Sequence, residues 1–317
     1  MTTAFASALI LLASAMPAFA EGDAPPVVAA EVVPDTDIFV GRIASYDSTP
    51  IIGSLKNVTN RKGYDNQPSF VAGKNAFYYV AEGKSGKTDI RLYDIGSGKS
   101  RALAASKDRS EYSPKEAPGG GISYIQENPE GDVTRVYRRS LAKKDAGAPV
   151  ADFAPLGYYA WLDDGKALGV YYRSEPGSLY RVEVASGEKA LLHEGIGRAI
   201  TSDKKGEHLW FTGIKGDAEA PSFELMRYDV AGGAVAPLLA LPAGSEDFAL
   251  LFDEDGAASI VLATSGAKLY SRSLRAENAN TDWVEIADLS EYGAAKATRI
   301  AVNDTESTIA IVAETAK

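Results

Sequence analysis

The feature that most constrains this chain is an internal repeat with a period of about 45 residues. One marker of the repeat is a polar turn that follows an apolar run, and its glycines are Gly73, Gly120, Gly165, Gly206 and Gly256. A second marker is a tyrosine inside a strand-like run, found at Tyr93, Tyr137, Tyr180, Tyr228 and Tyr270. Because the two markers alternate in constant order, they define successive copies of one structural unit.

Each unit reads as four short β-strands separated by turns. Alternating runs at 76–80 and 122–125 follow the first turn, and similar runs at 89–93 and 134–137 follow the second. No long stretch after residue 20 shows the 3.6-residue period of an amphipathic helix. Four strands in about 45 residues, with Gly and Asp at the turns, are typical of a β-propeller blade.

Counting the units predicts an all-β fold, a six-bladed β-propeller over residues 38–317. Five units begin near Asn66, Tyr112, Tyr158, Arg198 and Asp247. The remaining strand-like runs lie at the two ends of the chain, at 37–43 and 51–58 and at 298–304 and 307–312. We expect the N- and C-terminal runs to pair into the sixth blade, because this closure removes exposed sheet edges that could template aggregation.

The N-terminus reads as a processing segment. Residues 5–20 carry no charge and are too short to span a bilayer, and they end in small residues at Ala18 and Ala20. We expect residues 1–20 to be a signal peptide, cleaved between Ala20 and Glu21, and residues 21–37 to form an extended, proline-containing linker. The sequence thus predicts an exported protein, periplasmic or secreted, in a bacterium.

Several stretches resemble a known repeat family. They read LKNVTN at 55–60, GYDNQPSF at 63–70, TDI at 88–90 with YDI at 93–95, SEYSP at 110–114, GYYAW at 157–161 and GIGR at 195–198. They are similar to the WD40-like (PD40) repeats of exported TolB-type propellers. The resemblance implies the propeller fold and an envelope location. It implies less about function, because similar propellers serve as binding scaffolds and as caps of serine peptidases.

Composition excludes several classes of site and partner. The chain has 43 Asp and Glu against 33 Lys and Arg, a net charge of −10, and so lacks the basic surface that binds nucleic acid. It has no cysteine, which excludes disulfides and thiolate-bound metals, and only two histidines, His193 and His208. We interpret both histidines as structural.

Other apparent motifs are better explained as turns. The run GSGKS at 96–100 lacks the glycine that a phosphate-binding loop needs at position 93. No Gly-x-Ser-x-Gly pentapeptide is present. The acidic turns at 163–165, 253–256 and 303–306 do not match an EF-hand loop, and Asp-Gly is common in tight hairpins.

The candidate site lies where the innermost strand of each blade begins. In a propeller these strands line the axial channel, and the residues at their start lie at its mouth. The repeat brings one such position from each blade around a common axis. The candidate ligand- or partner-binding residues are Asp65, Gln67, Glu111, Tyr159, Arg198, Asp247 and Arg299.

Two interpretations of these residues stay open. They can solvate a wet channel and tie neighbouring blades together, or they can form a polar mouth that holds a peptide terminus or a small polar ligand. Arg198 is the residue to test first, because a guanidinium that faces carboxylates can bind an anionic group in a bidentate fashion. The alternative is that Arg198 has a structural role and forms a salt bridge between blades. We assign no catalytic and no metal-binding residue.

We therefore expect a non-catalytic scaffold that binds an envelope protein or peptide. The alternative is an enzyme of the lactonase or cyclotransferase type with its site in the axial channel, and a third function is a cap for a separately encoded hydrolase. The expected partner is an unidentified envelope protein or peptide and not nucleic acid. We expect a monomer with no membrane span and no cofactor, and a single Ca²⁺ ion in the channel stays open as an alternative.

Overall fold

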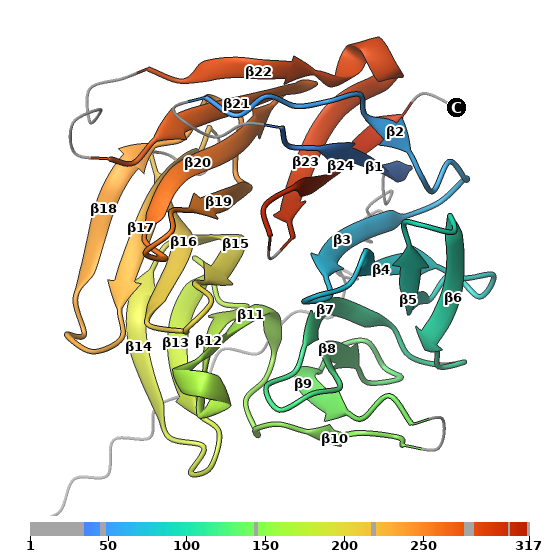
Figure 1. Cartoon of the computed structure of the whole chain (residues 1–317). Coiled ribbons are helices and arrows are strands. Elements are labelled where there is room, and N and C mark those ends of the chain that lie inside the picture. Colours follow the sequence, from blue (N-terminus) through green and yellow to red (C-terminus); the bar gives the residue numbers. More distant parts are fainter. Residues whose placement is uncertain are drawn as a thin grey trace, which may run out of the picture. The chain divides into compact units, whose positions relative to one another are not determined.

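The computed structural model describes residues 35–44, 49–142, 145–216, 220–275, 282–303 and 305–315. The predicted signal peptide and nearly all of the predicted linker lie outside these residues. Residues Val33–Lys317 form one compact unit, in which six four-stranded antiparallel sheets are arranged as a six-bladed propeller (Figure 1). Within the described part of the chain, no helix is long and apolar enough to cross a membrane.

Five blades are each built from four consecutive strands, numbered from the innermost strand outward. Blade 1 comprises β3 (Asp65–Phe70), β4 (Ala76–Glu82), β5 (Thr88–Asp94) and β6 (Lys99–Ala104). Blade 2 comprises β7 (Glu111–Glu116), β8 (Ile122–Glu127), β9 (Thr134–Arg139) and β10 (Ala148–Pro149). Blade 3 comprises β11 (Leu156–Leu162), β12 (Ala167–Tyr172), β13 (Ser178–Glu183) and β14 (Lys189–Glu194).

Blades 4 and 5 follow the same plan. Blade 4 comprises β15 (Ile196–Ser202), β16 (His208–Lys215), β17 (Ser222–Asp229) and β18 (Val235–Ala240). Blade 5 comprises β19 (Phe248–Phe252), β20 (Ala258–Ser265), β21 (Lys268–Ser273) and β22 (Val284–Asp288). Two short 3₁₀ turns, η1 (Asp163–Gly165) and η3 (Leu289–Tyr292), complete the described elements.

The sixth blade joins the two ends of the chain, as the sequence predicts. It has the strand order β2 (Lys56–Asn57), β1 (Thr36–Arg42), β24 (Thr308–Thr315), β23 (Ala294–Val302). β1 pairs with β24 over its whole length, from Thr36 opposite Glu314 to Arg42 opposite Thr308. β1 begins at Thr36, two residues before residue 38, where the propeller was predicted to begin. The outer strand is shorter than the expected run at 51–58.

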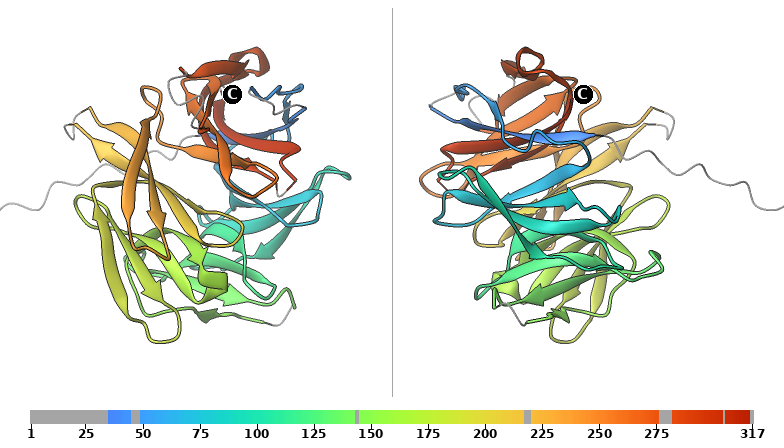
Figure 2. Two further views of the ribbon diagram at one scale, coloured as in Figure 1. Left: turned by 60° about the vertical axis from the view of Figure 1, so that its left-hand side comes forward. Right: turned by 90° about the vertical axis from the view of Figure 1, so that its right-hand side faces the viewer.

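The hydrophobic core lies between adjacent blades. One cluster joins blade 6 to blade 1 through Ile38, Phe77 and Val312, and another joins blade 4 to blade 5 through Trp210 and Leu250. Figure 2 shows the twisted sheets facing one another around the ring. Each sheet buries both faces against its neighbours, which explains why the second strands read as continuous apolar runs.

An irregularity at the start of two innermost strands directs side chains into the channel. Gln67 in β3 and Ser113 in β7 both precede a proline and have positive φ angles of 54° and 50°. The strand register shifts at both places. A non-glycine residue in this region of backbone space is strained, so the surrounding contacts must hold it. One such contact joins the two residues, because the Ser113 amide donates a hydrogen bond to Oε1 of Gln67.

Candidate functional site

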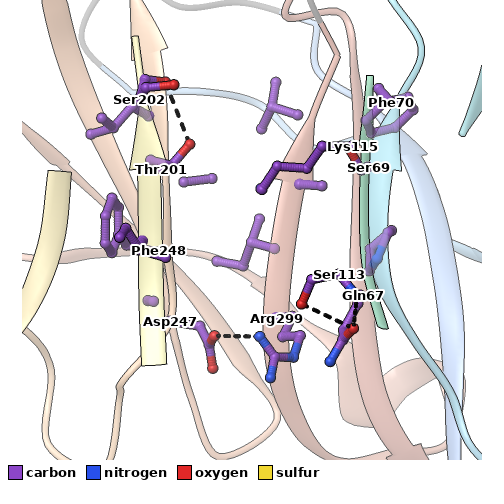
Figure 3. Close-up of a pocket in the computed structure, with 18 of the residues that line it drawn as sticks. Gln67, Ser69, Phe70, Ser113, Lys115, Thr201, Ser202, Asp247, Phe248 and Arg299 are labelled. Carbon is purple, nitrogen blue, oxygen red and sulfur yellow. Dashed lines mark hydrogen bonds and ion pairs between the residues drawn. The ribbon is translucent and has the colours of Figure 1, made fainter. Parts of the chain in front are cut away.

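A cavity of about 370 Å³ runs along the propeller axis and is lined by residues from the innermost strands of all six blades. Its volume falls in the range of roughly 300–1,000 Å³ that is common for small-molecule sites. In Figure 3, Asp247, Arg299 and Gln67 lie toward one end of the cavity, whereas Thr201 and Ser202 lie toward the other. We call the first end the floor and the second end the rim.

The floor is a network of charges that pair with one another. Arg198 of blade 4 contacts Asp247 at the start of blade 5 through Nη2 and Nε, and its backbone amide donates to Glu246 at 2.6 Å. Asp247 is only 5% exposed. Burial alone would raise the pKa of Asp247, but the guanidinium groups of Arg299 and Arg198 outweigh it and hold the pKa below its usual value. The floor carboxylate is therefore ionised and engaged by two cations.

A further contact at the floor crosses the ring. Arg299 in β23 donates a hydrogen bond of 2.7 Å from Nη2 to the hydroxyl of Tyr158 in β11, and its guanidinium carbon lies 4.9 Å from the centre of that ring. The two residues belong to blades 6 and 3, which are three blades apart in either direction around the ring. This contact therefore spans the channel.

Lys115 in β7 differs from the charged residues of the floor because it has no ion pair among the described residues. Its Nζ lies 5.8 Å from the centre of the Tyr159 ring, and no ion pair or hydrogen bond reaches Nζ from the described residues. Burial, with a smaller effect from the nearby Arg299, lowers the pKa of Lys115 to about 8. Lys115 thus contributes a cation to the cavity wall that no described carboxylate neutralises.

At the rim the cavity continues into a wider cleft of about 730 Å³. The hairpin turns between the first and second strands of blades 1 to 4 form this cleft, and it shares Ser69, Lys115 and Thr201 with the cavity wall. The channel is therefore asymmetric. A contact between opposite blades spans the floor, whereas the rim opens toward the turns.

Five of the seven predicted site residues line this cavity: Gln67, Tyr159, Arg198, Asp247 and Arg299. Their contacts are largely structural. Gln67 holds the Ser113 backbone, and Tyr159 is fully buried with its hydroxyl donating to Ser123 at 2.8 Å. The salt bridge between Arg198 and Asp247 joins blades 4 and 5, which matches the structural alternative for Arg198.

Asp65 and Glu111 do not lie on the cavity wall, which corrects their expected position. Asp65 is fully buried, and its Oδ1 accepts hydrogen bonds from Arg61 Nε and Nη2 at 3.0 and 2.6 Å. Glu111 is also fully buried, accepts hydrogen bonds from Ser106 and Gln126, and has a pKa raised by burial. Both precede the positive-φ residue of their strand by two positions. The change in backbone direction there breaks the alternation that would otherwise place them beside Gln67 and Ser113.

Sequence reasoning missed Lys115, although the repeat contains a signal for it. Aligning Gln67-Pro68-Ser69 with Ser113-Pro114-Lys115 places Lys115 at the position of Ser69. Both residues line the channel. A lysine in this inward-facing position of a buried strand departs from the repeat pattern.

The histidines and acidic residues do not assemble a metal centre in the described ranges. No group of three or more His, Asp or Glu side chains among these residues could hold a metal ion. His208 Nδ1 lies 2.7 Å from Asp203 of its own hairpin, and His193 packs near the ring of Phe211. These contacts are consistent with structural roles for both histidines.

Comparison with solved structures identifies the fold. A putative TolB from Agrobacterium tumefaciens matches with a TM-score of 0.62 and 12% identity, over 90% of this chain and 99% of that chain. TolB from Acinetobacter baumannii matches with a TM-score of 0.56 and 14% identity over 89% of this chain, which spans 65% of that protein's length. A gluconolactonase from Xanthomonas campestris matches with a TM-score of 0.58 and 10% identity, over 89% of this chain and 96% of that chain.

These similarities confirm the expected resemblance to TolB-type propellers at the level of fold. The fold is shared by proteins whose names indicate different functions, so it does not assign one to this chain. No family model and no curated protein matches this chain.

Proposed function

We propose that this protein is an exported, non-catalytic scaffold of the bacterial cell envelope that binds a protein segment or peptide through its channel and turn-side cleft. The asymmetry of the channel is the observation that supports this proposal. The Arg299–Tyr158 contact spans the floor, whereas the rim continues into a cleft of about 730 Å³. A ligand would enter from the turn side and reach Lys115 before it reaches the floor.

The state of the floor carboxylate favours binding over proton transfer. Asp247 Oδ2 contacts Arg198, and its Oδ1 lies 3.7 Å from Arg299 Nη1. A general base works best with an accessible oxygen and a pKa near the working pH, whereas the pKa of Asp247 is lowered and its oxygens face cations. This arrangement suits structural pairing between blades.

Export is part of the proposal and has its own test. Ala18 and Ala20 fit the small-residue pattern of a signal-peptidase site, so the mature protein should begin at Glu21. Intact-mass measurement of protein recovered from the periplasm would show a chain that lacks residues 1–20. A full-length product confined to the cytoplasm would contradict export.

The binding proposal can be tested by photo-crosslinking in the periplasm. A photoreactive amino acid replaces Lys205, which lines the cleft in the turn between β15 and β16. The matched control replaces Ser85, an exposed residue in the turn between β4 and β5. That turn lies at the opposite end of its blade, because successive strands run antiparallel.

We expect one discrete crosslinked species from position 205 and none from position 85. The crosslinked partner, once identified and purified, should bind the purified propeller at one-to-one stoichiometry. Equal crosslinking at both positions, or none at position 205, would argue against a cleft-mediated scaffold. Turnover of a sugar lactone by the purified protein would instead favour the enzyme alternative.

A further inference from the structure

The Lys115 side chain lines the cavity without an ion pair among the described residues. The charged group that acts on Lys115 is the guanidinium of Arg299, which has the same sign. Arg299 is itself committed to the floor, because Nη2 bonds Tyr158 and Nη1 faces Asp247. No carboxylate among the described residues offsets this repulsion at Lys115. Because burial raises the cost of an unpaired charge, an incoming anion would remove an unfavourable state.

The acidic groups at the rim do not compensate Lys115, because each has its own partner. Glu116, the next residue in β7, accepts a hydrogen bond from the Ala72 amide at 3.1 Å. Asp203 accepts from His208 and from backbone amides of its own hairpin. Glu306 lies 3.6 Å from a rim lysine and accepts from a backbone amide at 3.0 Å. None of these contacts involves Lys115.

Besides Lys115, the cavity wall contains apolar side chains and hydroxyl groups. Ile300 and Val302 line the cavity from β23 and are half-buried. Ser69 and Thr201 add hydroxyl groups, and in Figure 3 Thr201, Lys115 and Ser69 are drawn at similar height above the floor. A site with an apolar wall, a few hydroxyls and one cation fits a molecule with an apolar body and one anionic group.

We infer that the cavity binds a small organic carboxylate with an apolar body, the carboxylate lying against Lys115 Nζ and the body against the wall that includes Ile300 and Val302. This inference rests on the proposed binding function and names its ligand class. The same chemistry is offered by a free carboxylic acid and by the C-terminal carboxylate of a peptide that ends in a hydrophobic residue. The experiment therefore includes both.

The test uses isothermal titration calorimetry on the mature protein. The probe is 3-phenylpropanoate, and its uncharged analogue 3-phenylpropanamide is the control ligand. We expect the acid to bind and the amide to bind at least tenfold more weakly. Lys115→Gln should weaken acid binding by about 10- to 100-fold, because a charge-assisted hydrogen bond is lost. Lys84→Gln, at an exposed lysine in the turn between β4 and β5, is the matched control and should leave the affinity unchanged.

The pH dependence of the unmodified protein provides a readout that needs no variant. The protonated ammonium binds the ionised carboxylate, so the affinity should be constant from about pH 6, where the probe is ionised, up to the pKa of about 8 of free Lys115. Above this pH it should fall by about tenfold per pH unit, until the pKa of the complex is reached. A flat profile up to pH 10 would overturn the role of Lys115, even if the variants failed to fold.

A second arm separates the two sources of the carboxylate. The peptide acetyl-Ala-Ala-Phe with a free C-terminus is compared with its C-terminal amide. Tighter binding of the peptide acid than of 3-phenylpropanoate assigns the site to a peptide terminus, and the reverse order assigns it to a free acid. Failure of both acids to bind, or equal binding by Lys115→Gln, would overturn the inference. Crosslinking at position 205 would then still report on the scaffold function separately.

Discussion

The floor and the wall of the channel carry partly buried charges that differ in whether they are paired. On the floor, Arg198 and Arg299 pair with Asp247, and Arg198 also pairs with Glu246, which connects blades 4, 5 and 6. On the wall, Lys115 has no ion pair within the described residues and faces another cation. Buried charges that pair hold a structure together, whereas a buried charge left unpaired costs stability and is available to a ligand. The difference separates the residues that stabilise the channel from Lys115, which we propose binds the ligand.

The variant with the largest expected effect is a C-terminal deletion, which tests whether the channel floor depends on closure of the ring. Deleting residues 300–317 removes β24 and the last three residues of β23, the strand that carries Arg299. The deletion also leaves β1 without its partner along seven residue pairs. We expect the truncated protein to be unfolded or aggregated, as judged by circular dichroism and size-exclusion chromatography. A monomeric truncation with an unchanged melting temperature would contradict the closure of the ring through blade 6.

The next effect concerns the floor carboxylate. Asp247→Ala leaves the guanidinium groups of Arg198 and Arg299 facing each other without a shared anion, so we expect a loss of about 3–5 kcal/mol in the free energy of unfolding. Urea denaturation would measure it. Asp152→Ala is the matched control, because Asp152 is 92% exposed in its ion pair with Arg135. That variant should cost less than about 1 kcal/mol. Equal costs for the two variants would show that the floor network does not stabilise the ring.

Arg198→Ala should have a smaller effect than Asp247→Ala. Arg299 still faces Asp247 in this variant, and the Arg198 side chain is 34% exposed, so solvent screens part of its interaction. We expect a loss of about 1–2 kcal/mol and retained binding of 3-phenylpropanoate. An unchanged melting temperature combined with lost binding would reverse the assignment and make Arg198 a ligand-binding residue.

The smallest effect is expected on the wall. Lys115→Met removes a cation that has no ion pair in the described part of the chain and places an apolar side chain of similar length in the cavity. We expect the free energy of unfolding to stay constant or to rise by up to about 1 kcal/mol, while carboxylate binding is lost. A loss of several kcal/mol would show that Lys115 belongs with the structural charges of the floor.

The blades could be predicted from the sequence because their determinants are local. Turn glycines such as Gly73 and Gly165 have positive φ angles, and the apolar runs between them alternate as strands do. The sixth blade followed from counting strands, since 37–43 and 307–312 had no other partner. A salt bridge between blades was one of the two roles predicted for Arg198, although Asp247 was not identified as its partner. The contact from Arg299 to Tyr158 was not predictable, because it depends on the distance across the ring.

The orientation of side chains in the channel was only partly predictable. Regular alternation would have placed Asp65 and Glu111 on the wall beside Gln67 and Ser113. The left-handed backbone at Gln67 and Ser113 redirects the chain, and no residue type at these positions announces it, because glycine and asparagine are the usual signs. The position of Lys115 could be identified from the alignment of the first two repeats, but its lack of an ion pair among the described residues could not.

The pairing of β1 with β24 also affects how quickly the protein can fold. Thr36 and Glu314 are opposite each other, so the closing ladder joins segments separated by nearly the whole propeller. Bringing such distant segments together costs about 5 kcal/mol of loop-closure entropy before any hydrogen bond forms. Assembly of blades 1 to 5 should therefore precede a slow final docking step, during which the apolar residues Ile38 and Phe39 lack their partners. In that interval, docking of β1 within its own chain competes with docking of β1 onto β24 of a second molecule. Which of the two prevails depends on protein concentration.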